Sequence, residues 1–394
     1  MIDMGPHSSG EHLSADHSSS TAASAPAKKD TAVRPFVEAD IPQVVDMYWR
    51  LMRQREGSAP PELCPLFHKL YFENPWVDSA YPSLVYEGKS GDVIGFLGII
   101  ARKMSLCGEP VRIAFGGNFI VQPGSRSQLA GPRLLGAYLG SNYAAWQTDS
   151  ANDVSRALLE RLGFRTIPAL NLHWIRPLKP SHYAVYALTR GAGPAMASAL
   201  KIGTKPFCSL ADNLATRVKV SPFLQKEPRL RGSELDVETL LECLTNFREG
   251  YSFWAEYDVN SLKWLLAFMD RGTCRGRLRK IAVHDESDKI VGWYIYYVNP
   301  GSIGEVVQVG GDKKYTKDVL DHLFYDAWEK GVIGLHGVVD RRRMADLSDR
   351  GCIFTCRGGW NVAFSRNPKL LDVFECGDAF LTRLDGEWCL DPGD

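Results

Sequence analysis

One order of predicted elements occurs twice along this chain. Apolar residues recur at helical spacing over 40–52, a second helix is predicted over 62–72, and a strand–turn–strand hairpin follows at 84–100. The same order returns later, at 236–244, 262–269 and 281–298. The two hairpins align without a gap, with Gly95 against Gly292. This repeat predicts an internal duplication, and the alternative is two unrelated α/β beginnings that look alike.

After each hairpin the pattern continues as strand, helix, strand, helix. In the first half the predicted strands are 111–121 and 143–148, with helices from 132 and over 153–162. In the second half the strands are 305–309 and 332–339, with helices over 317–328 and 343–348. We therefore expect an α/β (α+β) protein of two domains, each a mixed sheet flanked by helices.

Composition bounds the function classes. The chain has 394 residues, enough for two domains, and its 46 Lys and Arg residues balance 46 Asp and Glu residues. No strong net field therefore attracts nucleic acid or an acidic membrane surface, although local patches stay open. No apolar run is long enough to span a bilayer, so we expect no membrane partner. Residues 1–31 are rich in Ser, Ala and His without an apolar core, which predicts a disordered tail rather than a signal peptide.

The nine cysteines favour a reducing compartment. They are odd in number, and no Cys-x-x-Cys pair occurs. A disulfide framework or a zinc site is therefore disfavoured, and we expect free thiols, a cytoplasmic location and no bound metal.

Residues 119–135 contain the strongest candidate for a ligand site. A β-branched strand ends at Pro123, a polar loop follows, and Gly131-Pro132 begins a helix. Such a turn directs unpaired backbone N–H groups and the positive end of a helix toward one point, which suits a phosphate. Arg126 and Arg133 could add charge-assisted contacts.

Residues 32–178 resemble the GNAT superfamily of N-acetyltransferases. Four segments carry the resemblance, in the family's order: Arg34-Pro-Phe with Asp40-Ile-Pro-Gln-Val, Val93-Ile-Gly-Phe-Leu-Gly, Val121-Gln-Pro with Gln128-Leu-Ala-Gly-Pro-Arg133, and Asn152 with Leu158-Leu-Glu-Arg-Leu-Gly-Phe164. The third resembles the family's acyl-CoA loop, Arg/Gln-x-x-Gly-x-Gly/Ala. The resemblance implies tandem GNAT-like domains with mostly antiparallel sheets: a tail at 1–31, an acyl-CoA domain at 32–178, a helical linker at 179–235 and a degenerate domain at 236–394.

The resemblance also implies roles for individual residues. The amides of the loop would hold the CoA pyrophosphate, Ile120 and Val121 would pair with the pantetheine arm, and Asn152 would reach the same arm. The cofactor-binding candidates are Ile120, Val121, Arg126, Ser127, Gln128, Leu129, Ala130, Gly131, Pro132, Arg133 and Asn152. The co-substrate would be acetyl-CoA or another acyl-CoA.

Three features depart from the family pattern. Arg133 stands where Gly or Ala is usual, and Leu159 stands where a tyrosine often serves as general acid. The counterpart loop in the second half, Gly310-Gly-Asp-Lys-Lys-Tyr315, lacks the Gln-x-x-Gly-x-Gly pattern, and its Asp312 would repel a phosphate. We therefore expect the second half to shape the substrate site or an interface rather than to bind CoA.

Amine acylation needs a base, and Asp149 is the predicted one because it follows a strand that borders the cleft. The alternative for Asp149 is a turn cap. Other candidates are Tyr143, His173, Asp385 and Glu387.

The predicted function is N-acyl transfer from acyl-CoA to an amine of a small molecule or an amino sugar, with a homodimer as one possible assembly. Two alternatives stay open. One is a FemAB-like aminoacyltransferase, which the balanced charge disfavours, and the other is a non-catalytic tandem binding module.

Overall fold

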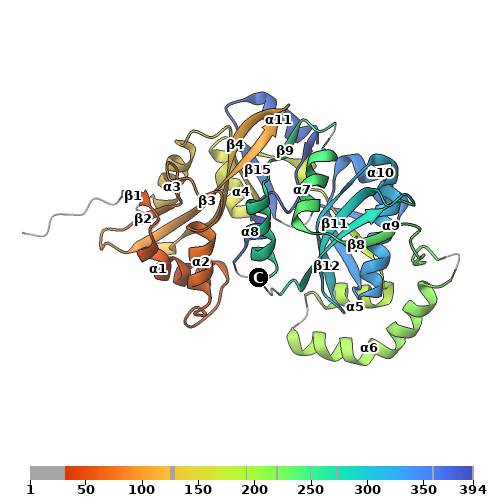
Figure 1. The fold of residues 1–394 in the computed structure, drawn as a ribbon. Helices are drawn as coiled ribbons and strands as arrows, with labels where there is room; N and C mark the ends of the chain where they lie inside the picture. The colour runs from red at the N-terminus through yellow and green to blue at the C-terminus, as the bar shows by residue number, and fades with distance from the viewer. Residues whose placement is uncertain are drawn as a thin grey trace, which may run out of the picture.

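Two twisted sheets stand next to each other, each flanked by helices (Figure 1). The computed structural model describes residues 32–124, 129–191, 193–218, 221–248, 250–271, 274–356 and 359–392. Most strand pairs are antiparallel, and the parallel pairs are β4 with β5, β12 with β13 and β9 with β16. The predicted α+β class with two mixed, mostly antiparallel sheets is confirmed.

The first sheet has the strand order β1-β2-β3-β4-β5-β15-β6. Its longest pair, β3 with β4, turns at Cys107-Gly108, where both residues have positive φ. β9 adds to β3, and β16 adds to β9. The strands are β1 (Ala32–Pro35), β2 (Leu84–Glu87), β3 (Val93–Leu106), β4 (Glu109–Val121), β5 (Ala145–Ala151), β6 (Arg165–Thr166), β9 (Phe253–Ala255), β15 (Trp360–Phe364) and β16 (Ala379–Phe380).

The second sheet repeats this arrangement, in the order β8-β10-β11-β12-β13-β7-β14. Gly292 lies opposite Val283 and Gly311, in the same way that Gly95 lies opposite Tyr86 and Val121. The predicted duplication is therefore visible in both order and register. The strands are β7 (His173–Pro177), β8 (Arg231–Glu234), β10 (Arg277–His284), β11 (Ile290–Val298), β12 (Ile303–Gly311), β13 (Gly334–Val338) and β14 (Ile353–Thr355).

Each sheet contains strands from the other half of the chain. β7 leaves the first half and lies between β13 and β14, while β15 leaves the second half and lies between β5 and β6. β9 and β16 of the second half also join the first sheet, beside β3, so each sheet draws strands from both of the predicted ranges, 32–178 and 236–394. Local periodicity identifies a strand but not the sheet that it joins, because pairing is a long-range contact.

Helices pack on both faces of each sheet. In the first domain α1 and α2 pack on the face that contains Phe96 and Ile100, and α3 and α4 pack on the face that contains Leu97 and Ala101. The second domain places α7 and α8 against Trp293, and α9 and α10 against Tyr294 and its neighbours. The helices are α1 (Ile41–Met47), α2 (Leu63–Tyr71), α3 (Ala130–Leu139), α4 (Asp153–Arg161), α7 (Val237–Asn246), α8 (Val259–Met269), α9 (Thr316–Glu329), α10 (Met344–Asp349) and α11 (Pro368–Glu375).

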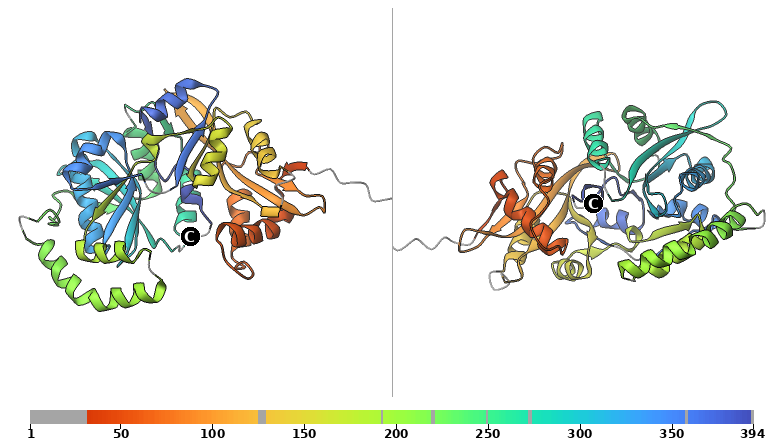
Figure 2. Two further views of the ribbon diagram at one scale, coloured as in Figure 1. Left: turned by 180° about the vertical axis from the view of Figure 1, so that it is seen from behind. Right: turned by 90° about the horizontal axis from the view of Figure 1, so that it is seen from below.

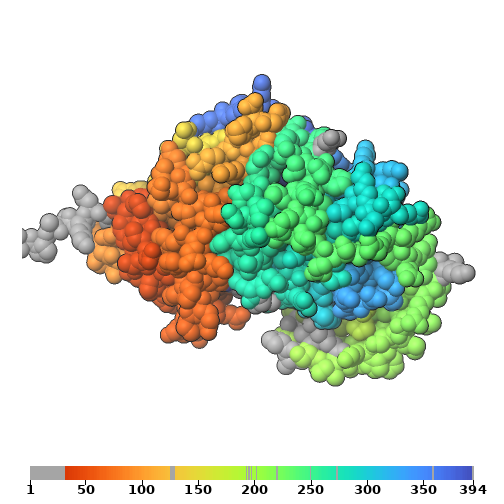
Figure 3. All heavy atoms as spheres, viewed as in Figure 1, coloured from red at the N-terminus to blue at the C-terminus, as the bar shows by residue number. Residues whose placement is uncertain are grey.

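One hydrophobic core joins the two halves. The cluster beneath α1 and α2 continues beneath α7 and α8 and includes Leu384 and Leu390 of the C-terminal segment. In Figure 3 the atoms of the first half lie directly against those of α7 and α8. The relative position of the two domains is therefore fixed by buried apolar contact.

The linker forms two helices at the outer edge of the second domain, α5 (Pro180–Thr189) and α6 (Pro194–Ala215). Figure 2 shows α6 as a long arc that follows the rim of the molecule. Among the described residues, none of the helices combines the length and the apolar character needed to cross a membrane.

The C-terminal segment runs between the two sheets after β16. Thr382 accepts a hydrogen bond from Gln308 of the second sheet at 3.1 Å. Five residues later, Glu387 accepts a hydrogen bond from Thr148 of the first sheet. The segment therefore connects both domains immediately before it ends in the short turn Trp388–Leu390.

Candidate active site between the two sheets

The first sheet opens between β4 and β5. These strands pair in parallel only from Ile113 to Phe115 and then diverge, and Gly116 and Gly117 stand where they separate. A cavity of about 80 Å³ lies in this opening, which we call the β4–β5 cleft. Its lining includes Leu97, Gly117, Phe119, Leu135, Tyr138, Gln147, Thr148, Ser150, Asn152, Leu159, Phe164 and Glu387.

A second cavity, of about 260 Å³, lies on the α1–α2 side of the same opening. We call it the α1–α2 cavity. Tyr48, Arg53 and Tyr71 line it on one side, and the turn at Trp388 lines it on the other. It meets the β4–β5 cleft at four shared polar or small residues, which are Gly117, Asn118, Ser150 and Glu387.

Glu387 lies at this junction and is 7% exposed. Its Oε1 atom accepts hydrogen bonds from Ser150 Oγ, at 2.5 Å, and from Thr148 Oγ1. Its Oε2 atom has no hydrogen-bond partner among the described residues. A β-carbon on Gly117 would come within 2.6 Å of Oε2, so the glycine permits the carboxyl group to approach the strand.

The environment of Glu387 favours its protonated form. Burial raises the pKa of Glu387, and repulsion by the nearby Asp149 raises it further, while the bonds from Ser150 and Thr148 oppose the rise. A carboxyl group with a raised pKa can accept and release a proton near neutral pH. Such groups occur at functional sites more often than elsewhere.

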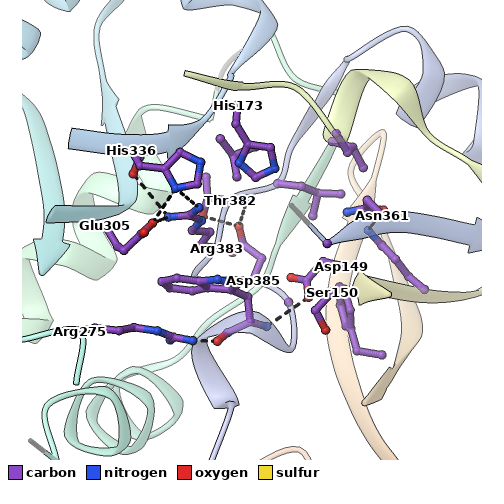
Figure 4. A pocket seen from close by; sticks show the side chains of 18 residues that line it. Asp149, Ser150, His173, Arg275, Glu305, His336, Asn361, Thr382, Arg383 and Asp385 are labelled. Carbon is purple, nitrogen blue, oxygen red and sulfur yellow. Dashed lines mark hydrogen bonds and ion pairs between the residues drawn. The ribbon is translucent and has the colours of Figure 1, made fainter. Parts of the chain in front are cut away.

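Asp149 faces a third cavity. It lies within β5, and its Oδ1 atom accepts a hydrogen bond from the Trp388 amide at 3.1 Å. The Asp149 side chain lies between the two sheets and is half-buried, because it borders the cavity. The loss of water around its carboxyl group raises the pKa of Asp149. The cavity, of about 360 Å³, is the interdomain cavity (Figure 4). Asp149, the predicted base, thus borders the interdomain cavity, whereas Glu387 lies beside β4.

A network of charged and aromatic side chains forms another wall of the interdomain cavity. Arg383 pairs with Glu305, and His336 Nδ1 lies 2.9 Å from Glu305 Oε2 (Figure 4). The His173 ring stacks on His336, with 5.0 Å between centroids. Burial opposes ionisation of Glu305, but Arg383 and His336 outweigh it and lower its pKa to about 2. Burial, with Arg383, lowers the pKa of His173 to about 3, so this imidazole is neutral at physiological pH.

Two polar atoms of the interdomain cavity lack partners among the described residues, Gln147 Oε1 and His173 Nδ1. Gln147 is 2% exposed, and its Nε2 atom donates to Asn361 Oδ1 at 3.0 Å, which directs Oε1 elsewhere. An amide oxygen can only accept hydrogen bonds, and a buried acceptor without a donor is unfavourable. The cavity therefore suits a molecule that donates hydrogen bonds.

The predicted phosphate loop follows β4, whose residues Gly117, Asn118 and Phe119 line the β4–β5 cleft. Ile120 and Val121 end β4, and α3 begins at Ala130, followed by Gly131 and Pro132. Leu129 precedes the helix with φ of 55°, a left-handed conformation that leucine rarely adopts. Arg126, Ser127 and Gln128 lie outside the described residues.

Two other positions named from the sequence, Asn152 and Leu159, line this cleft, and Arg133 lies in the first turns of α3. Asn152 caps α4 by accepting a hydrogen bond from the Ser155 amide at 2.9 Å, and its side chain lines the cleft. Arg133 donates to the Tyr86 hydroxyl at 3.0 Å. Leu159, at the position where the family often has a tyrosine, also lines the cleft, as does Tyr138. Sequence reasoning missed Gln147, Thr148 and Ser150, because small polar residues within a strand carry no local signal of function.

The second sheet opens in the same way between β12 and β13, which pair in parallel from Ile303 to Glu305. There the opening retains a cavity of only about 40 Å³, because residues 379–382 of the chain itself lie along it. Before α9, the Asp312 side chain accepts a hydrogen bond from the Lys314 amide at 2.9 Å. A backbone amide that could otherwise contact a phosphate at this turn therefore already donates a hydrogen bond to the Asp312 carboxylate.

The architecture resembles that of several solved structures. No family model matches the sequence, and no curated protein matches it. A probable N-acyltransferase of unknown function from Enterococcus faecalis superposes with a TM-score of 0.58 at 11% identity, covering 86% of this chain and 73% of that one. A GCN5-related N-acetyltransferase from Anabaena variabilis gives 0.56 at 12% identity, with 86% and 73% covered. This is a tandem GNAT fold.

A third GNAT-fold neighbour was solved with its donor bound. N-myristoyltransferase from Saccharomyces cerevisiae with bound myristoyl-CoA superposes with a TM-score of 0.53 at 11% identity, covering 86% of this chain and 80% of that one. All three neighbours are described as N-acyltransferases or probable ones. Among the described residues of this chain, no three His, Cys, Asp or Glu side chains gather closely enough to hold a metal ion.

Proposed function

We propose that this protein is a CoA-dependent N-acyltransferase that moves an acetyl or another short acyl group to the amine of a small polar molecule, such as an amino sugar. The observation that carries the proposal is the buried Glu387 carboxyl group at the junction of the β4–β5 cleft and the α1–α2 cavity. The GNAT fold supports acyl-CoA as the donor, since the yeast neighbour was solved with myristoyl-CoA.

In this proposal acyl-CoA enters along the β4–β5 cleft. Its pyrophosphate meets the backbone amides at the start of α3, where Leu129 has no side-chain oxygen to cap the helix and no acidic residue stands in the first turn. The pantetheine arm pairs with Ile120 and Val121 at the end of β4, and Asn152 stands across the cleft. The volume of the cleft, about 80 Å³ between apolar and polar side chains, favours a short acyl group over a long chain.

Glu387 acts as the general base in place of the predicted Asp149. The neutral amine attacks the carbonyl carbon of the thioester, a C–N bond forms and the C–S bond breaks. The proton of the amine passes to the ionised form of Glu387, which then returns a proton to the departing thiolate of CoA. Asp149 is a positioning residue in this scheme, because it holds the Trp388 amide next to Glu387 and raises the pKa of the base.

The interdomain cavity supplies the chemistry for a cationic, hydroxyl-bearing acceptor. Asp149 offers a carboxylate to an ammonium group, Gln147 Oε1 is positioned to accept a hydrogen bond from a hydroxyl group, and His173 Nδ1 accepts or donates one according to its tautomer. The cavity shares Ser150 with both of the other cavities and shares Arg275 and Trp388 with the α1–α2 cavity. These shared residues support a path from the acceptor to the donor.

The test is a screen of small amines and amino sugars with acetyl-CoA and longer acyl-CoAs, with release of free CoA as the readout. The proposal expects at least one amine to release CoA faster than water does. Titration calorimetry with acetyl-CoA in the absence of an acceptor separates binding from chemistry. The proposal would be overturned if no acyl-CoA bound at tens of micromolar, a range that enzymes commonly use.

A further inference from the structure

Helix α6 carries its apolar side chains on its outer face. Five large apolar residues on one face are exposed, and they follow one another at spacings of four, seven, three and four. At 3.6 residues per turn these spacings place them on one stripe about 27 Å long. The five are Met196, Leu200, Phe207, Leu210 and Leu214, with exposed fractions between 41% and 76%.

The opposite face of α6 holds the helix to the protein. Among the residues whose burial is described, Cys208 and Asp212 of α6 and its C-cap Thr216 are buried, one turn apart. Asp212 accepts hydrogen bonds from the backbone amides of Ser181, at 2.6 Å, and His182, at 3.2 Å, at the start of α5. The usual arrangement is therefore inverted, since a surface helix normally buries its apolar stripe. None of the four hydrophobic clusters in the described residues includes a residue of α6.

The same segment is strongly basic. Residues 178–226 contain seven Lys and Arg residues and one acidic residue, in a chain whose charges otherwise cancel. The single acid, Asp212, is buried, whereas Arg190 before α6 and Arg217 after it are exposed; Lys205 is also exposed, on the side of α6 opposite the stripe. The α5–α6 surface therefore combines an apolar stripe with a positive charge, and the rest of the chain carries the compensating negative charge.

The apolar stripe and the positive charge together indicate the kind of partner that this surface binds. A second copy of this chain would bring two basic segments together, and their mutual repulsion opposes a dimer through α6. An anionic bilayer provides both an apolar layer for the stripe and negative head groups for the basic residues. We propose that α6 docks in the plane of an anionic membrane surface, with Met196, Phe207 and Leu214 among the residues that enter the lipid.

The position of α6 permits this contact. It runs along the rim of the molecule, away from the body of both sheets (Figures 1 and 2). Leu188 at the end of α5 is 76% exposed and Val218 after α6 is 45% exposed, so exposed apolar side chains also precede and follow α6 in the chain. The docked protein would keep its β4–β5 cleft in water while it stays next to the membrane, and this inference does not depend on the proposed enzyme activity.

Flotation of the full-length protein with lipid vesicles tests the proposal. We expect binding to phosphatidylcholine vesicles that contain one third phosphatidylglycerol, weaker binding to phosphatidylcholine alone, and weaker binding as salt is raised. The double variant Phe207→Ser/Leu210→Ser should lower the partition coefficient roughly tenfold to a hundredfold, because two apolar side chains no longer enter the lipid.

The matched control is Val154→Ser, which removes an 80% exposed apolar side chain from a different helix, α4. It should bind vesicles like the unmodified protein, and both variants should keep the melting temperature because they change exposed side chains. Equal binding of the double variant and the control would overturn the proposal. So would a dimer in light scattering that the double variant abolishes, because the stripe would then be a contact between copies.

Discussion

The β4–β5 cleft and its counterpart between β12 and β13 are built by equivalent strands, yet they end differently. In the first, the residue before α3 is Leu129, whose side chain cannot cap the helix. Cavities of about 80 Å³ and 260 Å³ remain on the two sides of the opening. In the second, Asp312 bonds the backbone before α9, and residues 379–382 leave about 40 Å³. One copy of a duplicated fold has thus kept space for a ligand, and the other has filled it.

The C-terminal segment makes both outcomes possible. It fills the second cleft at Thr382 and then presents Glu387 to the first one five residues later. The loss of a site in one domain and the gain of a carboxyl group in the other are therefore properties of one short stretch of chain. Substitutions at the first cleft should therefore change activity or acyl-CoA binding strongly, and substitutions at the second cleft should change them weakly.

Replacement of the carboxyl group at the first cleft should have the largest effect. Glu387→Gln keeps the size of the side chain but removes the proton acceptor, so we expect kcat to fall by about a hundredfold to ten-thousandfold, as for other general bases. The measurement is CoA release under saturating acyl-CoA. Acyl-CoA affinity should stay within a few-fold, and the surface variant Glu375→Gln should keep full activity. Full activity of Glu387→Gln would show that the base is another group.

The pH dependence of stability should follow the same carboxyl group. Burial raises the pKa of Glu387, so the folded protein binds a proton that the unfolded chain has released. The unfolded chain therefore binds fewer protons, and stability falls as pH rises from the unfolded pKa, about 4, toward the raised value of about 8. Relative to Glu387→Gln, the unmodified protein should lose roughly 2–4 kcal/mol across this range. Denaturant melts at several pH values measure it, and parallel curves would contradict the assignment.

A charge at the start of α3 should weaken the donor. Gly131→Asp places a carboxylate near the expected pyrophosphate, and we expect the Kd of acetyl-CoA to rise roughly tenfold to a hundredfold. The matched control is Gly136→Asp, which adds the same charge on the same helix, at a position with nothing within 4 Å of an added β-carbon. Calorimetry on both variants gives the comparison. An equal loss of affinity in both would attribute the effect to net charge rather than to the helix start.

The corresponding change in the second half should have the smallest effect. Lys313→Glu/Lys314→Glu reverses the two positive charges in the turn before α9, and we expect the Kd of acetyl-CoA to change less than about twofold, because the site is distant and surface charges are screened. A larger loss would mean that the second half also binds the donor.

The sequence predicted the parts of this fold that depend on neighbours in the chain. The hairpins, the order of elements and the helix after the loop follow from periodicity and from Gly and Pro signals, which are local. Pro206 would be expected to interrupt a helix, yet α6 continues through it as one helix from Pro194 to Ala215. The partner sheets of β7 and β15 could not be predicted, because both strands pair across more than a hundred residues.

The candidate site also has a part that local sequence patterns predicted and a part that they did not. The cofactor positions came from a resemblance carried mainly by one contiguous loop between β4 and α3, and of these positions Asn152 lines the β4–β5 cleft. Glu387 was one of several candidates because nothing around it in the sequence signals catalysis. Its contacts with Thr148 and Ser150, more than 230 residues earlier, distinguish it from Asp385, whose carboxyl group accepts hydrogen bonds from Tyr257 and Thr382.

The exchange of β7 and β15 has a consequence for synthesis on the ribosome. When β5 and β6 emerge, the strand that belongs between them is still about two hundred codons away, so the first sheet has two unpaired edges for most of translation. Those edges are sites for wrong pairing or for chaperone binding until residue 364 has left the exit tunnel. A gene cut between the halves would therefore give two incomplete sheets rather than two independent domains.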